Sequence, residues 1–560
     1  VNEPAGKMRF GVLFLSCFVL IEGLVHAAEI LPNLKHEVNL MSGEYDVVVF
    51  INDNPEGLGN EFNAIEADLM QYKMLNPKLG SKTELVPFLN HPSKRLIYSP
   101  TGPLNQDTTD SRYLYNAAKN AIELAVKQGL RKPLLVLGPL KGVSLKENGP
   151  EHKWLKAPHS TLIALLGALQ ALYVPLTTRE LRPDSFPKYD LLGCLNCSAE
   201  IVDIAAKIET ARYVTRDICG TDEERMTAIA AHDYLKDAFK NSGVTVGEVK
   251  IDPNTYRMID AVNRAVKGTK YDARYVTLEY TSSNQTVVDK ELYFVGKGIT
   301  FDTGGASIKT GGNMLFMHND KCGAAGVAGF FKALDLLQPK TLNAHGKLAF
   351  VRNGLGADMY LVDEIIKSKA GIRSRIGSTD AEGRNVMVDL ITDCIEDIKN
   401  RSGDNYTKAH IFTVATLTGH VGQAFGKLTA VMDNGPAKKS GEAFKLRDGG
   451  ALIADIIEIS NLRREDYEVC YPVSEYEDLQ QRNTHANTIK YRGHQYPAAW
   501  MIMASGLSEY SNKAEESKQI KYTHVDVASS VGAHNSEASG VPTTMFLSTY
   551  VLPEILKENS

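Results

Sequence analysis

Seven residues of chemically useful types stand at fixed, short spacings in the middle of the chain. They follow the order K-x4-D-x6-K-x10-D and, further on, D-x-E-x-R. These residues are Lys297, Asp302, Lys309, Asp320, Asp380, Glu382 and Arg384. Taken singly, an aspartate before glycine is typical of a turn, and a lysine is typical of a solvated surface. The ordered combination is hard to produce by chance, so we predict a functional site.

The acidic members of this set indicate metal chemistry. Four carboxylates that converge on one cleft repel one another unless cations lie among them. Hard oxygen ligands in that number suit one or two divalent ions. Asp380, Glu382 and Arg384 occupy alternate positions, which would point the same way if that segment is extended.

The first part of the motif leaves a predicted strand. A buried strand is expected at 292–296, and the glycine-rich block Val295–Gly305 continues from it. Ligands of open α/β sheets bind beyond the carboxyl ends of strands, and glycines let the backbone approach a bound group. The block lacks the G-x-x-x-x-G-K-[ST] order, so it is not a phosphate loop.

Strands and helices alternate around this block. Buried strands are expected at 46–51, 95–99, 133–138, 275–280, 347–351 and 411–415, and helices at 113–129, 160–172, 205–215, 323–337 and 386–399. Thr221–Glu224 has the form of a capping box that opens a helix ending near Gly243. We therefore predict an α/β fold of two domains, each a mixed or mostly parallel sheet flanked by helices, with the larger C-terminal domain catalytic. The expected limits are a leader at 1–29, an N-terminal domain at 30–198, a connecting helix at 199–217 and a catalytic domain at 218–560.

Composition excludes several classes of protein. The 560 residues carry a formal net charge of −5, which argues against a nucleic-acid binder with its basic stripe. No stretch after the N-terminus is long and apolar enough to span a membrane. Seven cysteines are too few for a disulfide scaffold of this length. Cys194 and Cys197 form one C-x-x-C without the second pair of a zinc ribbon, so they are either unpaired or locally bridged.

The N-terminus has the pattern of a signal peptide. Met8-Arg9 gives a short positive region, Phe10–Ile21 is apolar, and Val25-His26-Ala27 fits a cleavage site. If Met8–Ala27 is a true signal peptide, the protein is secreted or lumenal. The alternative is a cytoplasmic protein.

The chain resembles the leucine aminopeptidase (cytosol aminopeptidase) family of dinuclear metallopeptidases. The likeness is strongest over Val295–Leu390 and continues through Ala415–Gly419 to Thr523–Ala528. It implies a metalloexopeptidase, cytosolic in most members, that releases N-terminal residues, often leucine, from peptides. It also implies two divalent ions per subunit (zinc, manganese or magnesium), bicarbonate and a homohexamer.

The resemblance also assigns roles residue by residue. Lys297, Asp302, Asp320, Asp380 and Glu382 would be metal ligands, with Asp302 and Glu382 bridging the two ions. Lys309 and Arg384 would be catalytic, and Arg384 would hold the bicarbonate. Met317, Leu417, Thr418 and Gly419 would contact the substrate.

Several neighbours of these residues depart from the family pattern. Lys321-Cys322 follows Asp320 where Met-Gly is usual, and His420 follows Gly419 in place of a small residue. Ser378, Asn385 and the segment Arg352–Ala357 also differ. These departures leave a second hypothesis open, in which the chain is a degenerate, non-catalytic paralogue that acts as a structural or binding hexamer.

Overall fold

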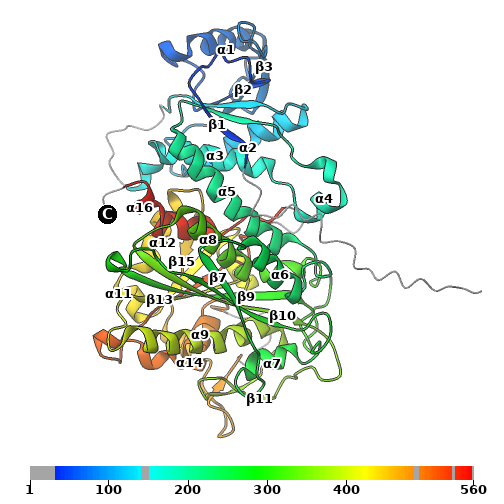
Figure 1. Ribbon diagram of the computed structural model, residues 1–560, viewed down its shortest axis with the longest axis vertical. Coiled ribbons are helices and arrows are strands. Elements are labelled where there is room, and N and C mark those ends of the chain that lie inside the picture. Colours follow the sequence, from blue (N-terminus) through cyan, green and yellow to red (C-terminus); the bar gives the residue numbers. More distant parts are fainter. Residues whose placement is uncertain (1–31, 141–149, 483–490, 533–536, 558–560) are drawn as a thin grey trace, which may run out of the picture.

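The structure is a computed structural model that describes residues 32–140, 150–482, 491–532 and 537–557. The predicted leader therefore lies outside the described residues. The chain forms α/β layers around two large sheets, as predicted (Figure 1). The first sheet takes its strands from residues 34–195 and the second from residues 244–526. The exact domain limits given above stay a prediction.

The first sheet is mostly parallel. Its order is β1 (Leu34–Glu37), β6 (Leu192–Leu195), β5 (Pro133–Leu137), β2 (Val47–Asn52), β4 (Arg95–Pro100) and β3 (Glu84–Pro87), and only the β3–β4 pair is antiparallel. Every residue of β2 is buried, because Val47 and Val49 face one core while Val48 and Phe50 face another. Covering both faces with helices produces the continuous apolar run that identified this strand.

The long helix α5 (Ala199–Gly220) runs from the first sheet toward the second (Figure 1). Ser198 caps its start by accepting a hydrogen bond from the Ile201 amide at 3.2 Å. The capping box predicted at Thr221–Glu224 is wrong. Thr221 instead ends α5, its hydroxyl donating to the Asp217 carbonyl at 2.6 Å. The next helix, α6 (Ala228–Ala238), has Thr227 as its cap.

The second sheet is mixed and carries the predicted site. Its order is β15 (Ile457–Ile459), β14 (Thr429–Asp433), β17 (Lys521–Asp526), β13 (Ala409–Ala415), β9 (Lys290–Asp302), β10 (Leu342–Asn353), β8 (Arg274–Tyr280) and β7 (Val244–Val249). The four central strands, β17, β13, β9 and β10, are parallel to one another. Their carboxyl ends therefore meet at one edge.

Alternate residues of β9 enter different cores on the two faces of this sheet. Phe294 packs into the core that includes α8 (Cys322–Leu337), whereas Tyr293 and Val295 pack into the core that includes α9 (Glu382–Ser402) and α14 (Tyr496–Ala504). Helix α8 also lies very close to α5, since a Cβ on Gly329 would stand 1.9 Å from Oγ1 of Thr215.

Four cysteines form two disulfide bonds, one more than the sequence indicated. Cys194 and Cys197 are bridged locally, one of the two alternatives left open. A second disulfide, which we did not anticipate, joins Cys219 to Cys322 across 103 residues of sequence.

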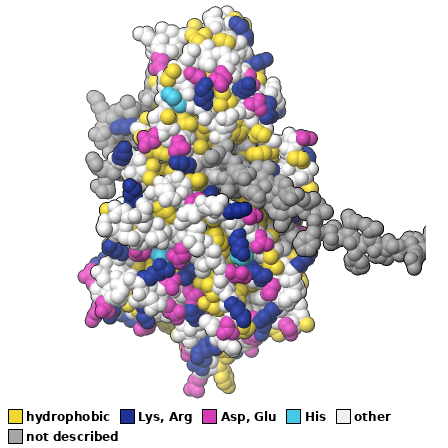
Figure 2. Space-filling view, viewed as in Figure 1, with side chains coloured by type: hydrophobic (Ala, Val, Ile, Leu, Met, Phe, Trp, Pro, Cys, Tyr) yellow, Lys and Arg dark blue, Asp and Glu magenta, His cyan; other side chains and the backbone are white. Residues whose placement is uncertain are grey.

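Charged side chains of both signs are interspersed over the face shown in Figure 2. Within the part of the chain that the structure describes, no helix is long and apolar enough to cross a membrane.

Candidate metal centre

The candidate site lies at the carboxyl edge of the four parallel strands, where ligands of open α/β sheets are expected to bind. Lys297 is in the middle of β9, and Asp302 is the last residue of that strand. Asn353 ends the neighbouring strand β10 and is paired with Asp302 in the sheet register. Thr416 directly follows β13, and Asp526 ends β17.

Three buried carboxylates come together at this edge. Asp302, Asp320 and Glu382 each offer one oxygen, and these oxygens lie within 4.8 Å of one another. Lys297 reaches into the same group, with its Nζ 2.8 Å from Oδ1 of Asp320 and 3.0 Å from Oε1 of Glu382. Four of the five predicted ligands therefore form one cluster.

Asp320 is held from two sides. It lies in the short 3-10 helix η6 (Met317–Lys321), directly before α8. Its Oδ1 accepts a hydrogen bond from Oγ1 of Thr416 at 2.8 Å, and Lys297 also donates to the Thr416 carbonyl at 2.7 Å. The turn after β13 thus orients both a predicted carboxylate ligand and the predicted lysine ligand.

The fifth predicted ligand, Asp380, joins the cluster through Lys309. The Nζ of Lys309 lies 2.9 Å from Oδ2 of Asp302 and 2.5 Å from Oδ1 of Asp380. The loop turns sharply here, since Gly304 has φ +85° and a Cβ there would stand 2.6 Å from the Ser307 carbonyl oxygen. Asp302 therefore contacts Lys309 and also belongs to the carboxylate cluster around Lys297.

The expectation of an extended segment at 378–384 is wrong. Residues Thr379–Ala381 form a 3-10 helix, and Glu382 is the first residue of α9. Ser378 caps this start, its hydroxyl accepting from the Asp380 amide at 3.2 Å. Asp380 and Glu382 still reach the same centre, because the turn carries Asp380 to the Lys309 side and the helix carries Glu382 to the Lys297 side.

Burial and mutual repulsion perturb the ionisation of these groups. Burial raises the pKa of Asp320 well above its usual range against the opposing charge of Lys297, and the nearby Glu382 and Asp302 add to the effect. Burial and the charges of Asp302 and Glu382 raise the pKa of Asp380 to about 6. Burial alone would lower the pKa values of Lys297 and Lys309, but the surrounding carboxylates hold both above their ordinary value. The four carboxylates outnumber the two lysines, so the centre has an excess of negative charge, which attracts cations.

Two atoms of this cluster fit a metal ion. Oδ2 of Asp320 and Oε2 of Glu382 are buried and have no hydrogen-bond partner among the described residues. A buried carboxylate oxygen without a donor carries a desolvation penalty, which a bound cation removes. Oxygen donors supplied by several carboxylates are the set that divalent ions prefer.

Arg384 lies beside the cluster in the first turn of α9. Its Nη1 donates to the Gln481 carbonyl at 2.9 Å, and its guanidinium lies 5.2 Å from the Tyr496 ring centre. Its Nε is buried and has no partner among the described residues. The side chain can therefore still bind an anion.

The predicted substrate-binding residues lie on two segments that also carry residues of this centre. Met317 begins η6, three positions before Asp320, and is half-buried. Leu417 and Thr418 follow Thr416 and are fixed by Asp526, whose carboxylate accepts from the Leu417 amide at 3.1 Å and from the Thr418 hydroxyl at 2.8 Å. Gly419 is exposed and begins α10 (Gly419–Phe425).

Sequence reasoning did not assign three residues that hold the site together. They are Asn353, which donates to Oδ1 of Asp302 at 2.7 Å, Thr416 and Asp526. Each stands at or just after the carboxyl end of a central parallel strand. The presence of polar residues at the ends of these strands was the sequence signal that could have identified them.

Comparisons with known proteins identify the family of this chain. The model of the cytosol aminopeptidase family, catalytic domain, matches residues 213–547. The Caenorhabditis elegans protein named "Putative aminopeptidase W07G4.4" is 35% identical over 532 residues, covering 92% of this chain and 97% of the worm protein.

Solved structures share the fold. Leucyl aminopeptidase from Trypanosoma brucei in complex with bestatin has a TM-score of 0.73 at 17% identity, covering 93% of this chain and 96% of that one. The bottromycin maturation enzyme BotP in complex with Mn has a TM-score of 0.68 at 18% identity, covering 90% of this chain and 98% of that one. At these identities the likeness concerns the fold alone. The family model, which spans more than half of the 560 residues, and the worm relative together show that the chain belongs to the cytosol aminopeptidase family.

Proposed function

We propose that this protein is a metal-dependent aminopeptidase, which hydrolyses the N-terminal residue of peptides with a preference for leucine-like residues. The observation that carries the proposal is the buried carboxylate cluster, in which Asp320 and Glu382 each keep one oxygen without a protein donor. We propose two divalent ions per subunit, either zinc, manganese or magnesium. Manganese is the ion present with the fold neighbour BotP.

The ligands divide between two subsites. Asp302 and Glu382 would be shared, Asp320 and Lys297 would complete one subsite, and Asp380 would complete the other. Lys297 would have to lose its proton in order to ligate, because only the neutral amine has a lone pair. Burial lowers the pKa of Lys297, but the carboxylates of Asp320, Glu382 and Asp302 raise it above its ordinary value, so a bound ion would have to displace this proton.

The remaining residues would act on the substrate. The ions would supply an activated water and a positive charge for the scissile carbonyl. Lys309 would remain an ammonium and donate to the carbonyl oxygen as negative charge develops on it. Asp320 would orient the free α-amino group, which restricts cleavage to the first residue. Arg384 would hold a bicarbonate ion through its Nε, which has no partner among the described residues, and this anion would supply a proton-transfer group beside the metal centre.

Substrate preference, assembly and compartment are also proposals. Met317 and the Leu417–Gly419 segment would contact the first side chain of the peptide. Six copies would assemble into a homohexamer. The protein would be secreted or lumenal if Met8–Ala27 acts as a signal peptide, and cytoplasmic otherwise. The joint presence of five metal-ligand candidates and of Lys309 and Arg384 favours catalysis over the non-catalytic alternative.

Metal removal tests the function directly. Hydrolysis of a leucyl amide should stop when the purified protein is stripped with a chelator, and manganese or zinc should restore it. Full turnover by metal-free protein would contradict the proposal. Asp302→Ala should bind fewer ions per subunit, because it removes the shared carboxylate. The exposed Asp289→Ala is the matched control and should bind as the wild type does.

A further inference from the structure

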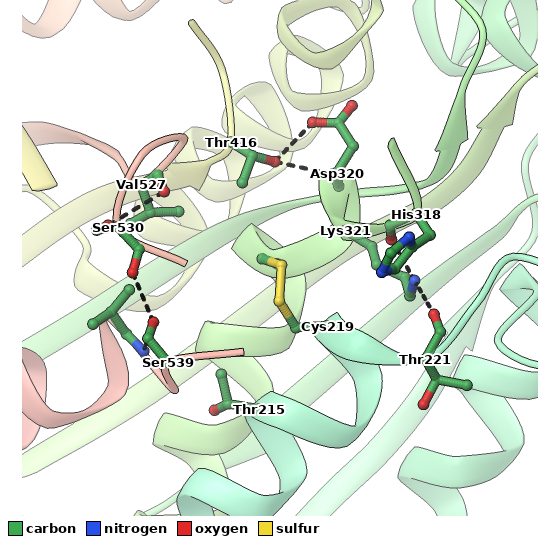
Figure 3. Close-up of a disulfide and its surroundings, with 12 residues drawn as sticks. Thr215, Cys219, Thr221, His318, Asp320, Lys321, Thr416, Val527, Ser530 and Ser539 are labelled. Atoms are coloured by element: carbon green, nitrogen blue, oxygen red, sulfur yellow. Dashed lines mark hydrogen bonds between the residues drawn. A yellow bond between two sulfur atoms is a disulfide. The ribbon is translucent and has the colours of Figure 1, made fainter. Parts of the chain in front are cut away.

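A buried disulfide lies directly beside the turn that carries Asp320. Cys219 is the second-last residue of α5 and Cys322 is the first residue of α8, only two positions after Asp320. The two cysteines are 2% and 0% exposed, respectively. Figure 3 shows the bond between the end of α5 and the start of α8, with Asp320 and Thr416 above it in the view. The bond thus ties a helix outside the metal centre to one of its ligands.

Lys321 makes a second link between the same two segments. Its fully buried Nζ donates to the Thr221 carbonyl, the residue that ends α5, at 2.7 Å. It also donates to the carbonyl of His318 within η6, and both bonds are drawn in Figure 3. The two residues that follow Asp320, Lys321 and Cys322, are therefore both fastened to the end of α5, the first by a polar contact and the second covalently.

The end of α5 is a firm anchor. Asp217, two residues before Cys219, is fully buried and accepts three hydrogen bonds. The donors are Tyr173 at 3.0 Å, Arg179 at 2.5 Å and Tyr234 at 2.9 Å. They come from before and after α5 in the chain, so this end of the helix is tied to both of its neighbouring segments.

The chain before Asp320 is, in contrast, exposed. Ile308 and Leu315 are 48% and 66% exposed, and Gly311 and Gly312 between them have positive φ. Burial begins only at Asp320 itself. A segment with few buried contacts opens locally at low cost in free energy. An anchor at residues 321–322 stops such motion before it displaces the ligand.

We propose that the Cys219–Cys322 disulfide, supported by Lys321, is a positioning device for Asp320 that sets the affinity of the centre for divalent ions. The inference rests on the proposed metal-dependent function and adds residues that touch neither ion nor substrate. Groups that orient a ligand without touching the metal typically contribute about 10- to 100-fold in metal affinity. The bond is buried, so replacement of both cysteines is a cleaner test than chemical reduction.

The experiment measures Mn²⁺ binding to the full-length, metal-free chain by calorimetric titration. Cys219→Ala/Cys322→Ala should raise the Kd for Mn²⁺ about 10- to 100-fold. Cys194→Ala/Cys197→Ala is the matched control, because it removes a disulfide at the end of β6 in the other sheet. The control should keep the wild-type Kd. A merely structural disulfide would lower the Tm of the metal-free protein and leave the Kd unchanged, and that result would overturn the inference.

Two further measurements keep the test decisive. Lys321→Met leaves the disulfide intact and should also raise the Kd for Mn²⁺. This variant replaces the double cysteine variant if the latter does not fold. An unchanged Kd in Lys321→Met would then overturn the inference. Alkylation of denatured, unreduced wild type should leave Cys219 and Cys322 unlabelled, and labelling of both would overturn it. Wild-type protein that binds none of Mn²⁺, Zn²⁺ and Mg²⁺ would instead refute the proposed function.

Discussion

The side-chain amide of Asn353 donates a hydrogen bond to Oδ1 of Asp302 across 2.7 Å, where strands β10 and β9 end side by side. The same amide donates to the Thr379 carbonyl at 3.1 Å, directly before Asp380. One side chain thus orients the carboxylate of Asp302 and the turn that carries Asp380.

Asn353→Ala should therefore weaken ion binding about 10- to 100-fold, the usual cost of losing a group that orients a ligand. Asn343→Ala is a suitable control, because Asn343 is buried and hydrogen-bonded near the opposite end of the same strand. Titration of both metal-free variants with Mn²⁺ checks the prediction. Equal affinities in the two variants would show that Asn353 does not orient the centre.

The two lysines should separate catalysis from metal binding. Lys309→Met should retain both ions, the fold and the oligomer, yet lose about 10²–10³ in kcat, as is typical when one oxyanion donor is removed. KM should change little, since the ground-state carbonyl carries no full charge. Lys297→Met should instead weaken one ion site.

Metal content and steady-state kinetics of both variants decide between these roles. The structure sharpens the comparison, because each Nζ contacts two predicted ligands: Lys297 contacts Asp320 and Glu382, and Lys309 contacts Asp302 and Asp380. Loss of metal in Lys309→Met, or full metal retention with lost turnover in Lys297→Met, would mean that the roles are reversed.

Assembly is testable in solution. Light scattering on the pure protein should give about six times the chain mass of 61.5 kDa, less any leader that is removed. A clean monomer at micromolar concentration would refute the homohexamer.

The signal-peptide pattern at the N-terminus predicts that the protein enters the secretory pathway. A signal peptide at Met8–Ala27 should leave a mature chain that begins near Ala28. N-terminal sequencing of the native protein measures this, and a mature protein that retains Met8 would exclude secretion by this route.

The sequence by itself determined the type of fold and the residues of the centre. The apolar runs of β2 and β9 were readable because both faces of each strand are buried, which suppresses the alternation of apolar and polar residues. The position of Asp302 near the carboxyl edge of the sheet was also readable, because ligands bind beyond the ends of parallel strands. The predicted strand limit at Gly296 was wrong, since β9 continues to Asp302 itself. The predicted ligands came from the resemblance of this motif to the cytosol aminopeptidase family, and the motif could be recognised because its spacing is local and therefore visible in the chain.

Only the tertiary structure decided how distant segments cooperate. Asp380 reaches the centre from a 3-10 turn capped by Ser378, and Glu382 reaches it from the start of α9. The alternate spacing of these residues in the sequence did not reveal this turn. The Cys219–Cys322 bond joins residues 103 positions apart, and no spacing rule predicts which cysteines fold together. Asn353, Thr416 and Asp526 likewise became part of the site only when β10, β13 and β17 aligned beside β9. Strand order depends on packing across the whole sheet, so these contacts are set by the fold and not by any segment of the sequence alone.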